Sequence, residues 1–203
     1  MLTIINYGVG NLTSILNMHK RIGVDAIVTA DIDEIKKADR IILPGVGHFD
    51  KCMQNFNASG MRPIIEEIAA KGNVPILGIC VGAQMMTKGS EEGTEPGLGW
   101  VDAMTVRFRK EPDETLRIPH MGWADIKVVP GAPLWSKLPA DPRFYFAHSY
   151  HFQFGGDDLT IARCHHGYDY TCAFQKQHIF GVQFHPEKSH RFGMDLLTGF
   201  STL

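Results

Sequence analysis

The sequence predicts an α/β protein with a mainly parallel sheet, and three observations support this class. The first half of the chain alternates short apolar runs with stretches of helical periodicity, a pattern typical of βαβ units. Glycine-rich turns follow several of these apolar runs. The second half carries many short β-like runs between turns, which indicates an antiparallel β extension of the same sheet. We therefore expect one domain over residues 1–203, with helices on both faces of the sheet.

The elements of the first half follow from periodicity and from turn and cap residues. Leu12, Ile15, Leu16 and His19 recur at helical spacing, and Asp31 is a good N-cap for a short helix. The strands are predicted at 2–6, 24–28, 40–43 and 74–80. The helices are predicted at 12–22, 31–38, 48–71 with a break near 59–60, and from 83 onward.

The second half is predicted to end with a core strand and a closing helix. Its β-like runs lie at 103–108, 123–129, 144–147, 159–163, 171–175 and 179–184, and the helix at 190–203. In an open parallel sheet, ligands collect at the carboxyl ends of the strands. Three segments follow strands there, at 44–47, 78–82 and 185–187, so we expect them to meet in one site.

Composition excludes several classes of protein. A formal net charge of −2 and a pI near 6.5 argue against nucleic acid or an anionic membrane as the main partner. Four cysteines in 203 residues make no disulfide framework, which fits a reducing compartment. The first residues resemble no signal peptide, and no segment reaches the length of a membrane span. These features predict a cytoplasmic protein.

The most informative motif is the pentapeptide GICVG at 78–82. It lies between the apolar run Val74–Leu77 and the start of a helix at Ala83. A G-x-C-x-G at such a turn is the thiol form of a nucleophile elbow. Flanking glycines permit the tight turn, and the helix start favours the reactive thiolate of Cys80. The alternative is a structural cysteine, since free cysteine is commonly buried as a small hydrophobe.

A cysteine nucleophile needs a base, and His185 is the best candidate among the ten histidines because it follows the strand at 179–184. Residues two apart in an extended chain project to the same side, and Pro186 biases His185 toward that geometry. Glu187 would then lie beside the ring and fix its tautomer. The alternative is a surface loop with an incidental His and Glu. The pairing with Cys80 favours the catalytic interpretation.

Backbone donors for an oxyanion are predicted after the third strand. The segment Pro44-Gly45-Val46-Gly47 has the glycines that let a backbone approach a ligand closely. The N–H of Val81, just after the predicted nucleophile, is the natural second donor. The alternative for the first segment is an ordinary strand-end turn, the commonest use of Pro-Gly.

The remaining polar clusters carry weaker signals. Cys164, His165, His166 and Cys172 match no common zinc spacing, and neighbours in a strand point to opposite faces. Tyr7–Asn11 lacks a complete phosphate-binding motif. We therefore predict neither a metal site nor a cofactor.

The chain resembles the class I, or triad, glutamine amidotransferases over nearly its whole length. The segments GICVGAQ at 78–84 and FGVQFHPEKS at 180–189 carry this resemblance. More narrowly, LPGVG at 43–47, GLGW at 97–100, PHMGW at 119–123 and FYFAHSY at 144–150 resemble the glutaminase subunits of imidazole glycerol phosphate synthase. The resemblance implies the flavodoxin-like amidotransferase fold and hydrolysis of glutamine to glutamate and ammonia.

The resemblance also implies a role for each matching residue. Cys80 would attack the side-chain amide of glutamine, His185 would shuttle the proton, and Glu187 would orient His185. The residues that would bind the substrate or its oxyanion are Gly45, Val46, Gly47, Val81, Gln84, His148, Ser149 and Tyr150. The residues that would face the partner are Asn11, His120, Met121, Trp123 and Lys188.

The implied partner is a synthase subunit. Free ammonia is mostly ammonium at neutral pH, so a dry route to a second site would keep it nucleophilic. The family's partner is a (βα)8-barrel cyclase subunit, which forms a heterodimer with the glutaminase and makes imidazole glycerol phosphate and AICAR in histidine biosynthesis. Its ligand would switch the glutaminase on, with a rearranged backbone at Pro44–Gly47 as the expected switch.

Two alternatives stay open within this resemblance. Departures from the family pattern, at Asn6, Val81, Ala83 and Ala124, leave the partner and pathway undecided. A paralogous glutaminase would supply ammonia for amidation of a surface-polysaccharide sugar, an interpretation that the stretch 166–170 favours by similarity. The other alternative is a non-catalytic regulatory subunit, against which the intact Cys, His and Glu argue.

Overall fold

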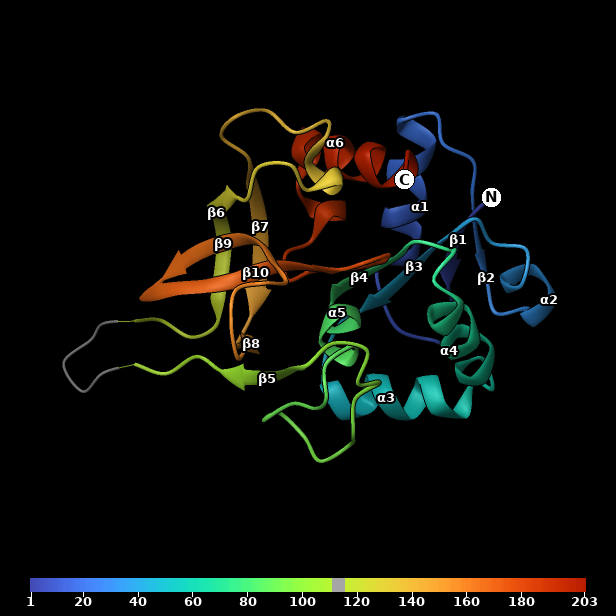
Figure 1. Ribbon diagram of the computed structural model, residues 1–203, viewed down its shortest axis with the longest axis horizontal. Helices are drawn as coiled ribbons and strands as arrows, with labels where there is room; N and C mark the ends of the chain where they lie inside the picture. The colour runs from blue at the N-terminus through green and yellow to red at the C-terminus, as the bar shows by residue number, and fades with distance from the viewer. Residues whose placement is uncertain (111–115) are drawn as a thin grey trace.

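The structure is a computed structural model, and it describes residues 1–110 and 116–203. Its strands form one mixed sheet in the order β2-β1-β3-β4-β11-β10-β9-β6-β7, to which β8 attaches through β10 and β5 through β8. The sheet is covered by helices on both faces at one end and continues into a β extension at the other (Figure 1). The predicted α/β class with an antiparallel extension is confirmed.

The parallel part of the sheet comes from the first half of the chain and the last strand. Its strands are β1 (Leu2–Ile5), β2 (Ala26–Thr29), β3 (Arg40–Gly45), β4 (Ile76–Cys80) and β11 (Ile179–Val182). The central strands β3 and β4 are buried along almost their whole length, because helices cover both faces. Parallel pairing places the carboxyl ends of β3, β4 and β11 at one edge of the sheet.

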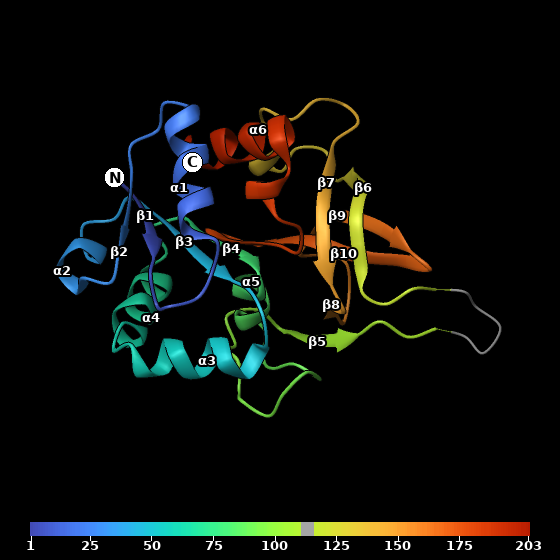
Figure 2. The same ribbon diagram turned by 180° about the vertical axis from the view of Figure 1, so that it is seen from behind.

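Two layers of helices enclose this sheet. On one face α1 (Leu12–Arg21) packs against α6 (His190–Ser201); on the other lie α3 (Phe49–Ala58), α4 (Arg62–Lys71) and the short α5 (Val81–Met85) (Figure 2). The single turn α2 (Ile32–Ile35) follows the edge strand β2. Each longer helix buries an apolar stripe against the sheet, which is the main stabilising term for a helix in a globular protein.

The antiparallel extension contains β5 (Ala103–Arg107), β6 (His120–Val128), β7 (Arg143–His148), β8 (Tyr150–Phe154), β9 (Thr160–His166) and β10 (Tyr168–Lys176). Two 3₁₀ turns, η1 (Pro133–Trp135) and η2 (Pro186–Lys188), complete the fold. Strand β10 joins the extension to the parallel part, because it pairs with β11 on one side and with β9 on the other.

The predicted elements agree with the structure apart from one helix that is shorter and one strand that was missed. The helix predicted at 31–38 is a single turn, Ile32–Ile35, because Asp39 and Arg40 already lead into β3. The helical region at 48–71 is two helices; the predicted break is confirmed at Gly60, whose φ of +73° ends the first one. Strand β8 was not predicted, because its five residues, YHFQF, show no clear alternation of apolar and polar side chains.

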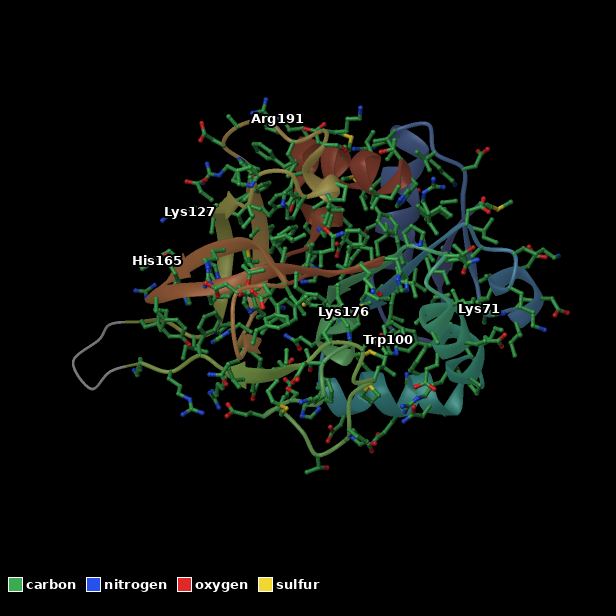
Figure 3. All side chains as sticks on the ribbon, viewed as in Figure 1. Lys71, Trp100, Lys127, His165, Lys176 and Arg191 are labelled. Carbon is green, nitrogen blue, oxygen red and sulfur yellow. The ribbon has the colours of Figure 1, made fainter. Side chains whose placement is uncertain are left out.

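Charged side chains lie on the outside of this fold. Lys71 on α4 and Lys127 on β6 lie on opposite sides of the molecule, and Arg191 lies at the start of α6 (Figure 3). Exposed ion pairs such as Lys71–Glu67 contribute less than about 1 kcal/mol each. Among the described residues, 1–110 and 116–203, the helices are all too short or too polar to cross a bilayer.

Candidate active site

The ends of β3, β4 and β11 form a cavity of about 410 Å³. In the parallel register Gly45 lies beside Cys80, and Val182 lies beside Ile79, so the segment that follows β11 passes next to the cysteine. A cavity of this size accommodates a small ligand such as an amino acid. Its lining residues are Val46, Gly47, Cys80, Val81, Gln84, Glu92, Pro119, Met121, Ala147, His148, Ser149, Tyr150, His185 and Lys188.

Cys80 occupies a strained turn between β4 and α5. Its φ of +53° and ψ of −115° lie in a region that side-chain-bearing residues rarely adopt, as expected for a nucleophile elbow. The residue is 4% exposed and lines the cavity, so its thiol is in position to contact a ligand in the cavity although the side chain is almost fully buried. Such strain persists because the surrounding structure enforces it.

Glycines enforce this turn by allowing backbone to pack on backbone. A Cβ on Gly78 would lie 2.6 Å from Cα of Ala83, and one on Gly82 would lie 2.0 Å from the carbonyl oxygen of Leu43. A Cβ on Gly45 would lie 2.3 Å from the amide nitrogen of Gly82. The end of β3 and the elbow therefore interlock, which brings the predicted oxyanion segment against the start of α5.

Two side chains hold the backbone of the predicted oxyanion segment. The Tyr7 hydroxyl donates to the carbonyl of Pro44, and the Cys52 thiol donates to the carbonyl of Val46 at 3.4 Å. Burial raises the pKa of Tyr7 well above 10 and that of Cys52 to about 11, so both groups stay protonated and can donate. Gly47, with a φ of +88°, then turns the chain toward α3.

His185 and Glu187 form a buried pair behind the cysteine. The turn η2 folds Glu187 back, so that Nδ1 of His185 donates to its Oε1 at 2.8 Å. The side-chain amide of Asn11 donates to the same oxygen at 2.9 Å. The backbone of His185 is fixed as well, because its N–H donates to the carbonyl of Tyr145 and its carbonyl accepts from the hydroxyl of Ser189.

The electrostatics of this pair favour a cationic imidazole. Burial by itself lowers the pKa of His185, but hydrogen bonds to Cys80 and Glu187 and the negative charges of both outweigh burial and raise it to about 10. Burial raises the pKa of Glu187, but the hydrogen bonds from His185 and Asn11 and the charge of His185 prevail and lower it below 4.5. A cationic imidazole is the partner that a cysteine nucleophile needs, because the thiolate is the attacking species.

We expect Glu187→Gln to lower the pKa of His185 by about 1–3 units, the size of shift that a close opposite charge produces. The NMR titration of His185 measures this directly. Glutamine hydrolysis, if the pair acts in it, would fall at least about 100-fold in kcat/KM. Glu34→Gln, in an exposed pair with Lys37, is the matched control.

The His185–Glu187 pair should also make the stability of the protein depend on pH. His185, with a raised pKa, contributes stability that is full below pH 6.5 and is lost as the pH rises through about 10. Glu187, with a lowered pKa, contributes stability that is present above pH 4.5 and is lost on acidification. Glu187→Gln should therefore lower the free energy of unfolding most between about pH 4.5 and 10, where both groups are charged in the native protein. An unchanged pKa of His185 in this variant would contradict this account.

His148, Gln84 and Tyr150 form one wall of the cavity through a shared carbonyl. Nδ1 of His148 and Nε2 of Gln84 both donate to the Tyr150 carbonyl, at 2.7 and 3.3 Å. Burial lowers the pKa of His148 well below 6.5, so the ring is neutral and its Nε2 accepts from the Tyr170 hydroxyl at 3.2 Å. His148 thus positions β8 and does not carry charge into the cavity.

The structure adds a carboxylate that the sequence did not predict as part of the site. Glu92 lines the cavity, and its Oε2 accepts from the backbone N–H of Phe49 at the start of α3, at 2.8 Å. Asp50 holds the same loop by accepting from the backbone N–H groups of Thr94 and Glu95. An acid in a Gly-rich loop is common on any surface, so no sequence signal singled out Glu92.

The predicted partner-facing residues divide into three groups. Met121 and Lys188 line the rim of the cavity, and Trp123, 40% exposed, stacks on His190. Asn11 instead supports Glu187 through its side chain. His120 is buried, because it stacks on Phe146 and His166 and hydrogen-bonds the Tyr170 hydroxyl, so its side chain offers little surface to a partner.

The residues considered for a metal site do not converge. Cys164 and Cys172 are buried free thiols whose pKa values are raised by burial. His165 hydrogen-bonds Asp169 on the exposed surface, and His166 bonds the Arg117 carbonyl. Cys164, His165 and His166 each have a hydrogen-bond partner where they lie.

Comparison with known proteins identifies relatives over the full length. The family model for "Glutamine amidotransferase class-I" matches residues 3–200. The chain is 46% identical over 204 residues to the imidazole glycerol phosphate synthase subunit HisH of Bdellovibrio bacteriovorus, covering 100% of both chains. It is 42% identical over 203 residues to HisH 2 of Pseudomonas aeruginosa, again covering 100% of both. Among solved structures, PurLQS from Thermotoga maritima superposes with a TM-score of 0.73 at 16% identity, over 98% of this chain and 96% of that one.

Proposed function

Because the chain belongs to the class I glutamine amidotransferases, we propose that residues 1–203 act as one glutaminase domain that hydrolyses glutamine and passes ammonia to a synthase subunit. The observation that carries this function is the strained Cys80 in a cavity wall, with a cationic His185 and Glu187 behind it. This arrangement is that of a cysteine acyl-transfer catalyst.

The first half of the reaction releases ammonia. The Cys80 thiolate attacks the side-chain carbonyl carbon of glutamine, and the carbonyl electrons move onto its oxygen. Backbone N–H groups at Val81 and in the segment Gly45–Gly47 stabilise this oxyanion. The imidazolium of His185 then protonates the leaving amide nitrogen, so that the C–N bond breaks, ammonia departs and a glutamyl thioester remains.

The second half restores the cysteine. Neutral His185 takes a proton from a water molecule, whose oxygen attacks the thioester carbonyl. The C–S bond breaks, the new carboxyl group gives its proton to solvent as glutamate leaves, and the thiolate and imidazolium are regenerated as a pair. Glu187 stabilises the cationic form of His185 throughout, and Asn11 in turn fixes the carboxylate of Glu187.

Charge and shape suggest how the cavity selects glutamine. Glu92 offers a carboxylate to the α-ammonium group of the substrate at one end, while Cys80 lies at the reacting amide. Gln84, Ser149 and Tyr150 also line the cavity and supply polar contacts. A substrate with both a positive α-amino group and a neutral side-chain amide satisfies these groups.

The partner would bind at the rim of the cavity. Met121 and Trp123 are exposed apolar side chains on β6, and the Lys188 amine lies 5.8 Å from the ring of Tyr145. Exposed Met and Trp are residue types enriched in protein interfaces. The names of the curated relatives are those of a subunit of imidazole glycerol phosphate synthase, so we favour the cyclase subunit of that enzyme as the partner over a polysaccharide-modifying enzyme or a non-catalytic role.

Glutamate release measures this function directly. We expect low activity for the chain alone and at least about ten-fold higher activity with the (βα)8-barrel cyclase subunit and that subunit's own substrate present. Full activity without any partner would contradict the coupling. Failure to bind the cyclase subunit, with activation by a sugar-amidating synthase instead, would favour the alternative pathway.

A further inference from the structure

A buried chain of amide groups runs from the wall of the cavity to the sulfur of Cys80. Gln183 follows β11, is fully buried, and has its backbone N–H bonded to the carbonyl of Cys172. Its side-chain Oε1 accepts from Nε2 of Gln84 at 3.0 Å, and its Nε2 lies 3.7 Å from Sγ of Cys80. The catalytic steps proposed above make no use of this residue.

The carbonyl of Tyr150 determines which end of each amide group in this series donates and which accepts. The carbonyl of Tyr150 is only an acceptor, so Gln84 must point its NH2 group toward it, as the 3.3 Å contact requires. The same NH2 group then faces Gln183, which must present its carbonyl oxygen to Gln84. Gln183 is therefore left with its NH2 group toward Cys80.

On this basis we propose that Gln183 is a positioning residue for the proposed glutaminase reaction, which donates an N–H···S hydrogen bond to the Cys80 thiolate with a polarity dictated by the Tyr150 carbonyl. A donor at the sulfur stabilises its anionic form and fixes its direction while His185 moves protons nearby. The inference rests on the proposed function for its role in catalysis, although the hydrogen bond itself does not.

Alkylation of Cys80 by iodoacetamide, without glutamine, tests the hydrogen bond. Mass spectrometry resolves Cys80, which lines the cavity, from Cys52, Cys164 and Cys172, which do not. In Gln183→Met, which keeps the length of the side chain but loses the donor, the pH of half-maximal alkylation should rise by about one unit. Gln183→Glu, an isosteric second variant, should raise it further, because a carboxylate oxygen would face the sulfur.

Reversing the donors and acceptors along the amide groups of Gln84 and Gln183 gives an independent test. In Gln84→Glu, a carboxylate oxygen replaces the NH2 group that donates to Gln183. The Gln183 amide should therefore rotate, so that its own NH2 group donates to that carboxylate and its oxygen faces Cys80. The pH of half-maximal alkylation should then rise although Gln183 itself is unchanged. Gln153→Met, an exposed position on β8, is the matched control and should alkylate like the wild type.

The outcomes separate this inference from the proposed function. We also expect Gln183→Met to lower kcat for glutamine, counted per folded molecule, about ten-fold with little change in KM. Folded Gln183 variants that alkylate with the wild-type pH profile would overturn the inference. A shifted profile in a chain that hydrolyses no glutamine, even with its partner, would instead retain the hydrogen bond and refute the function.

Discussion

Cys80→Ala, in complex with the cyclase subunit, is expected to lose glutamine-dependent synthesis by at least about 10³-fold while ammonium salts still support it. The sulfur is the atom that becomes acylated, and alanine leaves nothing to attack the amide. Ammonia supplied from solution bypasses this step, because the second reaction belongs to the partner. The measurement is the rate of product formation with glutamine and, separately, with an ammonium salt at a pH where free ammonia is available.

Cys164→Ala is the matched control for this substitution. Cys164 is also a buried free thiol, but it lies on β9 and outside the lining of the cavity. It should retain both activities. Loss of ammonia-dependent synthesis in Cys80→Ala would instead indicate that the cysteine supports the complex structurally, as a scaffolding subunit requires.

Gly82→Ala is expected to lower the free energy of unfolding by at least about 3 kcal/mol, at the upper end of the cost of overpacking. The added Cβ would lie 2.0 Å from the carbonyl oxygen of Leu43. Its nearest neighbours are all backbone atoms, of Leu43 and Pro44, so no flexible side chain can move aside to make room. Either β3 or the elbow must shift, so glutaminase activity should be lost even where the variant folds. Urea unfolding and glutamate release measure the two effects.

Gly156→Ala provides the control for the cost of a methyl group alone. A Cβ there meets no atom within 4 Å, so the substitution should change stability by less than about 0.5 kcal/mol. A Gly82→Ala variant that is as stable and as active as this control would show that β3 and the elbow do not interlock as described.

Local patterns predicted most of the parallel part of the fold, because they depend on neighbours in the chain. Buried strands such as β3 and β4 read as short apolar runs, and Gly60 marked the break between α3 and α4. The extension was harder, since β8 pairs with both β5 and β10 and takes its strand geometry from those partners. Strand content that depends on distant pairing is weakly encoded in local propensity.

The candidate site shows the same division between near and distant relations. GICVG and His-Pro-Glu are contiguous motifs, so the cysteine, the histidine and the glutamate could be predicted as a set before any coordinates. The resemblance implied Asn11 only as a partner contact, and nothing near it in sequence indicates its hydrogen bond to Glu187, 176 residues away. The roles of Glu92 and Gln183 follow only from the structure, in which Glu92 lines the cavity and Gln183 lies next to the sulfur of Cys80.

By itself the sequence determined the α/β class, the strained turn at Cys80 and the His-x-Glu pair, because each rests on backbone geometry within a few residues. Only the tertiary structure decided that His120 is buried, that Gly45 and Gly82 interlock, and that a Tyr150 carbonyl orients the amide next to the sulfur. Those facts arise where strands and loops from separate parts of the chain pack together, and packing between distant segments leaves no periodic trace in a single sequence.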